Sequence, residues 1–401
     1  MTLHETVSRF LGLEAKASKT AKFIALAAGG HPVWTPRDFS SLAREASPRT
    51  AIVYRAVRMI AEAAASVPFY LHDGQHDIDA HPLLQLLARP NQMQCGPDLL
   101  EAWYGHLMVA GNAYLEAVAV EGRVRELHAL RPDRMKVVPG ADGWPEAYEY
   151  AVAGQTVRFE QEGGIRPILH MALFHPLNDH YGLSPLEPAA VGIDLHNASG
   201  AGTRRCSTTR RVRRARSCIP PRTGQLAPEQ YERLKSEFED SFQGAKNAGR
   251  PLLLEGGLDW KSMSFSPKDM DFIAAKHVAA REVALALGVP PMLLGIPGDN
   301  TYANYAEANR SFWRQTVLPL VNRTAKALSA WLGPAFAGGP VEAPALQLKP
   351  DLDAVEALST EREALWARVQ AADFLTVNEK RAAVGYGAVD GGDVMGPAPP
   401  P

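Results

Sequence analysis

The sequence predicts an α+β protein in which short strands are set among amphipathic helices. Apolar residues recur at helical spacing over residues 51–66 and again over 267–332, whereas residues 113–175 form short alternating runs broken by glycine and proline. The chain has 401 residues, of which 46% are apolar, so a sizeable core can form. Its 33 glycines and 31 prolines indicate many turns but no collagen-like repeat.

The first half of the chain alternates helices with strands. The helical stripe over residues 51–66 consists of Ile52, Val53, Ala56, Val57, Ile60 and Ala63. Further helices are predicted at residues 81–87 and 98–109, and strands at residues 67–71, 113–116, 134–138 and 148–152. Proline and glycine pairs between these segments predict turns.

Helix signals dominate the second half. Ser184-Pro185-Leu186-Glu187 predicts a helix start with a capping box, and Ser266-Pro267-Lys268-Asp269 repeats the device. A longer helix opens at residues 304–307 and contains Pro319, which is expected to kink it. A helix near residues 352–372 and a short one capped by Thr376 follow.

Several functional classes lack their sequence signatures. No secretory h-region and no run of about 20 apolar residues is found, which predicts a soluble cytoplasmic protein. Three cysteines without CxxC spacing argue against disulfides and zinc, and no GxxxxGK[ST], GxGxxG or GxSxG motif occurs. His72, His76 and His81, and likewise His170, His175 and His180, match no metal motif, so no cofactor is expected. A metal hydrolase that uses this histidine-rich half stays an alternative.

The charge balance hides one unusual segment. The chain has 42 basic and 44 acidic residues, which excludes a globally basic nucleic-acid coat. Residues 202–217 nevertheless hold seven arginines and no acid; without them, 35 basic residues face 44 acidic ones. The seven are Arg204, Arg205, Arg210, Arg211, Arg213, Arg214 and Arg216.

Short phrases occur in a fixed order along the chain: Tyr54-Arg55-Ala56-Val57, Arg89-Pro90-Asn91, Gly111-Asn112-Ala113-Tyr114, Ile168-Leu169-His170, Tyr181-Gly182-Leu183-Ser184-Pro185-Leu186, Gly288-Val289-Pro290-Pro291, Leu318-Pro319, and Thr376-Val377-Asn378-Glu379 with Gly391-Gly392-Asp393. Together they resemble the portal proteins of long-tailed bacteriophages and of phage-derived gene transfer agents. Each phrase is weak alone, but their order and spacing cover most of the chain.

The resemblance implies a ring, normally twelve-fold, at one capsid vertex, through which double-stranded DNA is packaged, retained and ejected. Implied partners are other copies of the chain, the major capsid protein, the terminase and a head-completion adaptor, with no membrane and no catalysis by this chain. The implied location is the virion or a phage-like particle, assembled in the bacterial cytoplasm. The small clip and short C-terminal region favour a gene transfer agent.

The implied domains follow in chain order. They are an N-terminal segment (1–30), an α+β wing (31–225), a first stem helix (226–246), a small β clip (247–266), a second stem helix (267–290), a tunnel loop (291–303), a long kinked helix (304–333), a helical crown region (334–390) and a disordered tail (391–401).

Three sets of residues would serve the channel. The tunnel loop that faces DNA would comprise Leu294, Gly295, Ile296, Pro297, Gly298, Asp299, Asn300, Thr301 and Tyr302, a segment with few packing residues; an ordinary helix connection is the alternative. An acidic stem that repels phosphates would comprise Glu229, Glu232, Glu237, Glu239 and Asp240, although a solvated helix face is the commoner meaning of such a run. The clip would dock partners through Pro251, Leu253, Glu255, Asp259, Trp260 and Lys261.

The arginine segment 204–216 has three interpretations. It could serve a DNA-binding regulatory protein or enzyme, or form a solvated basic loop. We favour a shifted reading frame, because codons for WNKALLDNSARPSGAL, read one base late, encode residues 202–217, and the restored string suits the family pattern. The native protein would then lack the cluster as well as Cys206 and Cys218. Resequencing the gene across this window tests the hypothesis.

Overall fold

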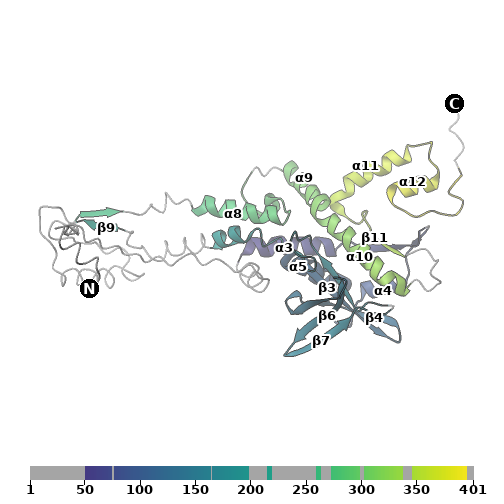
Figure 1. Ribbon diagram of the computed structural model, residues 1–401. Coiled ribbons are helices and arrows are strands. Elements are labelled where there is room, and N and C mark those ends of the chain that lie inside the picture. The colour runs from purple at the N-terminus through teal and green to yellow at the C-terminus, as the bar shows by residue number, and fades with distance from the viewer. Residues whose placement is uncertain are drawn as a thin grey trace. The chain divides into compact units, whose positions relative to one another are not determined.

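The structure, a computed structural model, describes residues 50–74, 76–163, 165–197, 215–218, 259–262, 272–298, 302–336 and 346–394 (Figure 1). The chain divides into two compact units. One holds Trp34–Asn197 and His277–Pro401, and the other holds Met1–Val33 and Ala198–Lys276. The described part of the second unit includes an antiparallel pair of strands, β9 (Ala215–Cys218) and β10 (Asp259–Ser262).

Three helices form the N-terminal part of the first unit, as the sequence predicts. They are α3 (Ala51–Ala65), α4 (Pro82–Ala88) and α5 (Gly96–Ala110). The buried stripe of α3 is rich in alanine, and small side chains let helices pack closely. Asp98 accepts a hydrogen bond from the N–H of Cys95 (3.1 Å) at the start of α5, and Trp103 lies fully buried near its middle.

In the described part of the same unit, nine strands form three antiparallel sheets, ordered β11-β1-β2, β4-β3-β8 and β5-β6-β7. Their bounds are β1 (Phe69–His72), β2 (Asp77–Ile78), β3 (Asn112–Val120), β4 (Arg123–Leu130), β5 (Met135–Pro139), β6 (Pro145–Val152), β7 (Gln155–Glu160), β8 (Ile168–Ala172) and β11 (Gln347–Pro350). β11 reaches β1 from 275 or more residues along the chain, pairing Tyr70 with Lys349 and Leu71 with Leu348. The C-terminal part is therefore built into the N-terminal core.

Five further helices that the structure describes lie in the C-terminal part. They are α8 (Phe272–Ala286), α9 (Tyr302–Phe312), α10 (Leu318–Phe336), α11 (Ser359–Gln370) and α12 (Val377–Val384). The predicted capping box of the last helix is confirmed, because Thr376 Oγ1 accepts from the N–H of Glu379 (3.2 Å) and Glu379 accepts from the N–H of Thr376 (2.8 Å).

The expected kink at Pro319 corresponds to an interruption one turn earlier. Residues Trp313–Val317 form a π-helical turn between α9 and α10, closed by a bond from the N–H of Leu318 to the carbonyl of Trp313. Proline has no N–H for the carbonyl of Gln315, four residues before it, so regular α-helical bonding fails at this point. A wider turn is one way a helix accommodates such a break.

The predicted helix start at Ser184 is wrong in position. Residues 185–189 form turns, and the helix runs over residues 190–197. Ser184 Oγ accepts from the N–H of Leu186 (3.1 Å) and donates to the carbonyl of Val109 (2.7 Å), so it ties the turn to α5 instead of capping a helix. Pro188 supplies the reason, because a proline disfavours helical backbone in the residue before it.

A single large core joins α3, α5, β3 and α10. Trp103 of α5 donates from its indole N–H to the hydroxyl of Thr324 on α10 (3.2 Å), so the polar atoms of this contact are paired inside the core. A second cluster lies between the β3 and β6 sheets and includes Tyr114, Met135 and Tyr148. Among the described residues, no helix is both long and apolar enough to cross a bilayer.

Candidate functional site

The start of the expected tunnel loop is fixed by a left-handed turn at the end of α8. Gly288 has a φ of 67°, its N–H donates to the carbonyl of Leu285 (3.0 Å), and the N–H of Val289 donates to Ala284 (2.9 Å). This is the usual way in which a glycine ends a helix and redirects the chain. A short 3-10 helix, Pro291–Leu294, follows at once.

The first half of the loop is packed along α8. Ile296 is only 4% exposed and contacts Ala280 and Ala284, and Arg281 donates from Nη2 to the carbonyl of Pro297 (2.6 Å). Ile296 is thus a packing residue that the sequence did not single out, whereas Gly295, Pro297 and Gly298 are exposed. Asp299, Asn300 and Thr301 lie outside the described residues.

The far end of the loop is joined to its start. Tyr302 begins α9, which leads into the π-helical turn, and Thr316 of that turn donates from Oγ1 to the carbonyl of Gly288 (2.6 Å). A Cβ on Gly288 would lie 2.8 Å from that hydroxyl oxygen, so the contact also requires glycine. Both ends of the loop are thus held by one set of packed helices.

Most of the predicted stem and clip residues lie outside the described part of the chain. Glu229, Glu232, Glu237, Glu239, Asp240, Pro251, Leu253 and Glu255 lie outside the described residues, as does the arginine segment up to residue 214. Asp259, Trp260 and Lys261 lie in β10, where they pair with Cys218, Ser217 and Arg216 of β9.

Three of the quoted phrases meet at one buried junction centred on Asn112, which is 6% exposed. Its Nδ2 donates to the carbonyls of Ala110 (3.0 Å) and Gly182 (3.2 Å). Its Oδ1 accepts from the N–H of Gly182 (2.8 Å) and from Nε2 of His170 (3.1 Å). Because backbone groups are on both sides, the orientation of the amide is fixed, and one side chain joins segments 58 and 70 residues away.

Glycines make this junction possible by letting backbones touch. Gly111 has a φ of 71°, and a Cβ there would lie 2.5 Å from the carbonyl carbon of Leu183. A Cβ on Gly182 would overlap the carbonyl oxygen of Gly111 and the nitrogen of Leu173. The N–H of Leu173 donates to that same carbonyl of Gly111 (2.7 Å), which closes the junction.

The phrases at residues 376–379 and 391–393 also contact each other, near the C-terminal end. Asn378 of α12 donates from Nδ2 to Asp393 (2.8 Å) and to the carbonyl of Val389 (3.1 Å), and its own N–H donates to the carbonyl of Gly392 (2.9 Å). The prediction of disorder from residue 391 is therefore wrong for residues 391–394; residues 395–401 lie outside the described part.

His170 is held neutral in the Asn112 junction. Its ring stacks on Tyr114, with ring centroids 4.2 Å apart, and its Nδ1 lies 3.4 Å from the hydroxyl of Tyr148. The amide oxygen of Asn112 can only accept, so Nε2 carries the proton and Nδ1 accepts. Burial, with a smaller contribution from His180, lowers the pKa of His170 to about 4.

The low pKa of His170 predicts acid lability. An unfolded histidine takes up a proton near pH 6.5, so between pH 6.5 and 4 the unfolded chain binds the proton and the folded chain does not. This group's contribution is full above pH 6.5 and falls by about 3 kcal/mol on acidification to pH 4. His170→Gln is expected to remove that part of the slope, measured by urea unfolding at several pH values; an unchanged slope would contradict it.

Three further histidines take part in local structure. His72 lies 3.0 Å from Asp77, His81 caps α4 by accepting from the N–H of Leu83 (3.2 Å), and His175 accepts from the N–H of Leu177 (3.0 Å). Within the described ranges, no group of three or more histidine, cysteine or acidic side chains is arranged to hold a metal ion.

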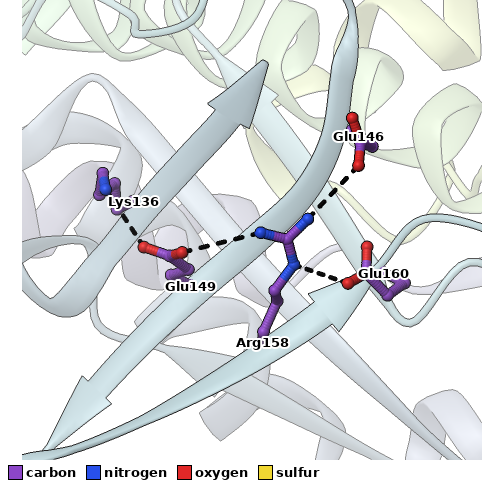
Figure 2. Close-up of polar contacts among 5 residues, drawn as sticks. All are labelled: Lys136, Glu146, Glu149, Arg158 and Glu160. Carbon is purple, nitrogen blue, oxygen red and sulfur yellow. Dashed lines mark hydrogen bonds and ion pairs between the residues drawn. The ribbon is translucent and has the colours of Figure 1, made fainter. Parts of the chain in front are cut away.

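Charged side chains form an exposed network across β5, β6 and β7 (Figure 2). Lys136, Glu149 and Arg158 are direct cross-strand neighbours, with Lys136 Nζ 3.2 Å from Glu149 and Arg158 Nη1 3.9 Å from Glu149. The guanidinium of Arg158 also reaches Glu160 (2.6 Å) and Glu146 (3.4 Å). These pairs set the sheet register and leave the face with an excess of negative charge.

This network is expected to stabilise the protein only slightly. Arg158→Ala should lower the thermal midpoint a little at low salt, because exposed ion pairs are solvated and screened. The difference from wild type should shrink as salt rises from about 0.05 M to about 1 M, where the screening length is only about 3 Å. A salt-independent loss in thermal scans would show that packing of the arginine stem matters more than its charge.

Sequence reasoning did not assign roles to Asn112, His170 or Arg158. For Arg158 a signal existed, because Arg158 and Glu160 lie two residues apart and therefore share one face of a strand. For Asn112 the phrase itself was visible, but its partners are distant in sequence.

Comparison with known proteins gives a consistent result. The family model described as phage portal protein matches residues 51–385. A chain in the neck of an empty gene transfer agent (GTA) particle, computed with C6 symmetry, is 52% identical, with a TM-score of 0.68, covering 91% of this chain and 98% of that one.

Two further matches agree. A chain in the neck of a native GTA particle, computed with C12 symmetry, is 51% identical, with a TM-score of 0.65, covering 90% of this chain and 97% of that one. The portal protein of Enterobacteria phage HK97 is 25% identical over 377 residues, covering 88% of this chain and 83% of the relative. The mixed helix and sheet architecture, the buried junctions formed by the quoted phrases and the match over residues 51–385 lead to one conclusion: the chain belongs to the phage portal protein family.

Proposed function

We propose that this chain is the portal subunit of a gene transfer agent or similar phage-like particle, in which twelve copies form a ring at one capsid vertex. The ring is the channel for packaging, retaining and releasing double-stranded DNA. The observation that carries the proposal is the 51% identity to a chain of a neck computed with C12 symmetry, over 90% of this chain. The match of residues 51–385 to the portal family model supports it independently.

The segment from Leu294 to Tyr302 is proposed as the loop that faces DNA. Its packed first half and the bond from Thr316 to Gly288 support this role, because they hold the loop on one set of packed helices. A loop of this kind can contact a moving duplex without disturbing the helices that carry it. The acidic residues 229–240 are proposed as the stem wall, where negative charge keeps phosphates from binding.

Partners and catalysis belong to the same proposal. Residues 247–266 would dock the terminase and the head-completion adaptor, and the wing would contact the major capsid protein. The portal protein family is structural rather than catalytic, and the chain carries no nucleotide-binding motif. ATP hydrolysis for packaging is therefore assigned to the terminase.

Imaging of the purified full-length protein tests the proposal. Negative-stain electron microscopy and native mass spectrometry are expected to give closed rings with a central hole and a single dominant copy number. A particle that stays monomeric at every concentration would contradict the proposal. Tight DNA binding by such a monomer, weakening steeply with salt, would instead favour the DNA-binding alternative.

A further inference from the structure

The loop after β8 presents two apolar side chains to solvent. Phe174 is 83% exposed and Leu177 is 91% exposed. Among the residues that the structure describes, Met93 at 90% and Leu285 at 81% expose a similar share, followed by Trp144, Val394 and Phe374 at 72% to 74%. Single exposed apolar residues are common, but two on one short loop form a surface that we call the 174–177 knob.

The knob is held rigidly. Its entry is fixed by the bond from the N–H of Leu173 to Gly111, and its tip by the bond from the N–H of Leu177 to Nδ1 of His175 (3.0 Å). Its exit is fixed by Asn178, whose Oδ1 accepts from the N–H groups of His180 and Tyr181, both at 2.9 Å.

Beyond Asn178, the chain enters the Asn112 junction directly. Tyr181 accepts at its hydroxyl from the N–H of Val137 (2.8 Å), and Gly182 bonds to Asn112 on both sides of its peptide. A side chain on such a frame loses little conformational freedom when it is buried in a partner. Mobility of the loop therefore does not account for the exposure.

The chemistry of the knob fits a protein partner. Residues 174–179 contain no lysine or arginine, and they include Asp179, which is exposed. His175 uses Nδ1 as an acceptor within the loop, and Arg323 donates from Nη2 to the carbonyl of Ala172 at the base of the knob. Phosphate backbones require several cations, whereas an apolar pair gains free energy from burial against another apolar surface.

We propose that the 174–177 knob packs against the neighbouring copy of this chain in the portal ring. This inference rests on the proposed function, because a ring places an identical copy on each flank of every subunit. Ring contacts are head-to-tail, so a projecting patch must meet an unlike surface of its neighbour. The chain carries unlike apolar surface of this kind, for example Val278 and Leu285, which lie seven residues apart on α8 and are 51% and 81% exposed.

Ring assembly by full-length variants tests the inference. Phe174→Ser combined with Leu177→Ser is expected to raise the protein concentration for half-assembly about 10-fold or more, measured by native mass spectrometry. Its thermal unfolding as a monomer should match wild type, because neither side chain is buried within the chain. Met93→Ser is the matched control, since Met93 is equally exposed but single, and it should assemble like wild type.

Photo-crosslinking gives a second measurement. The photoreactive amino acid p-benzoylphenylalanine at position 177 should yield crosslinks between two copies, while the same probe at position 93 should not. Wild-type rings with unchanged assembly of the double variant, or crosslinks only within one chain, would overturn the knob and leave the portal function standing. Wild-type protein that forms no ring would overturn the proposed function, and the knob with it.

Discussion

Gly182→Ala is expected to prevent folding or to destabilise the protein by more than about 4 kcal/mol. The added methyl group would overlap the carbonyl oxygen of Gly111 and the backbone nitrogen of Leu173. No rotamer change can relieve this, because alanine has no side-chain torsion and both obstacles are main chain. Separating the two backbone segments would also break the bonds of Gly182 to Asn112. Soluble yield and the free energy of unfolding in urea are the measurements.

A matched control for Gly182→Ala lies in α5, the helix that ends at Gly111. Gly105 lies inside α5 with nothing within 4 Å of a built Cβ, so Gly105→Ala should fold normally. It should be more stable than wild type by about 1 kcal/mol, because alanine is the better helix former.

Gly111→Ala provides a second variant of the junction if Gly182→Ala yields no soluble protein. It combines a positive φ of 71° with a Cβ contact of 2.6 Å to the carbonyl oxygen of Gly182. A loss below about 1 kcal/mol in both junction variants would contradict the close approach of the two backbones.

Much of the local structure follows from the sequence because its causes are local. The alanine-rich stripe of α3, the cap at Thr376 and the glycine at the end of α8 each depend on residues within four or five positions. Periodicity and capping rules suffice for such features. The start of the helix near Ser184 was misplaced because a hydroxyl that suits a cap was used to bind α5 instead.

Packing in the candidate site could not be predicted from local sequence rules. Leu294 to Gly298 is a segment with few packing residues, in which one isoleucine among glycines and prolines gives no period, yet Ile296 fills a space between Ala280 and Ala284. That space exists only once the chain has turned back at Gly288, so it is a consequence of tertiary structure. The pairing of β11 with β1, far apart in the chain, is of the same kind.

A family phrase can be recognised in the sequence without revealing why its residue types are needed. The phrase containing Gly111 and Asn112 and the phrase containing Gly182 were recognisable by order and spacing alone. Only the structure gives the reason for these residue types, since the amide joins three segments and the two glycines allow two backbones to touch. A residue's distant partners cannot be read from its neighbours.

Asn112→Ala tests that explanation and is expected to cost about 3 to 5 kcal/mol of stability. The substitution removes two donated and two accepted hydrogen bonds at a position that is 6% exposed. The N–H of Gly182 and Nε2 of His170 would then lose their acceptor inside the protein, which costs more than the bonds themselves contribute. Asn322→Ala is the control, because Asn322 is exposed on α10, and its effect should stay within about 0.5 kcal/mol.

Asn112→Asp separates hydrogen bonding from space filling at the same junction. The aspartate has nearly the same shape but cannot donate to the carbonyls of Ala110 and Gly182, so stability at pH 7 should fall although no cavity is created. Its carboxylate would also favour the charged form of His170, which raises that histidine's pKa from about 4. The folded and unfolded values then approach each other, and the loss of stability between pH 6.5 and 4 should become smaller than in wild type. Urea unfolding across that pH range distinguishes the two effects: a variant that is less stable at pH 7 but keeps the wild-type acid slope would show that the donated bonds of Asn112 matter while residue 112 does not act on the pKa of His170.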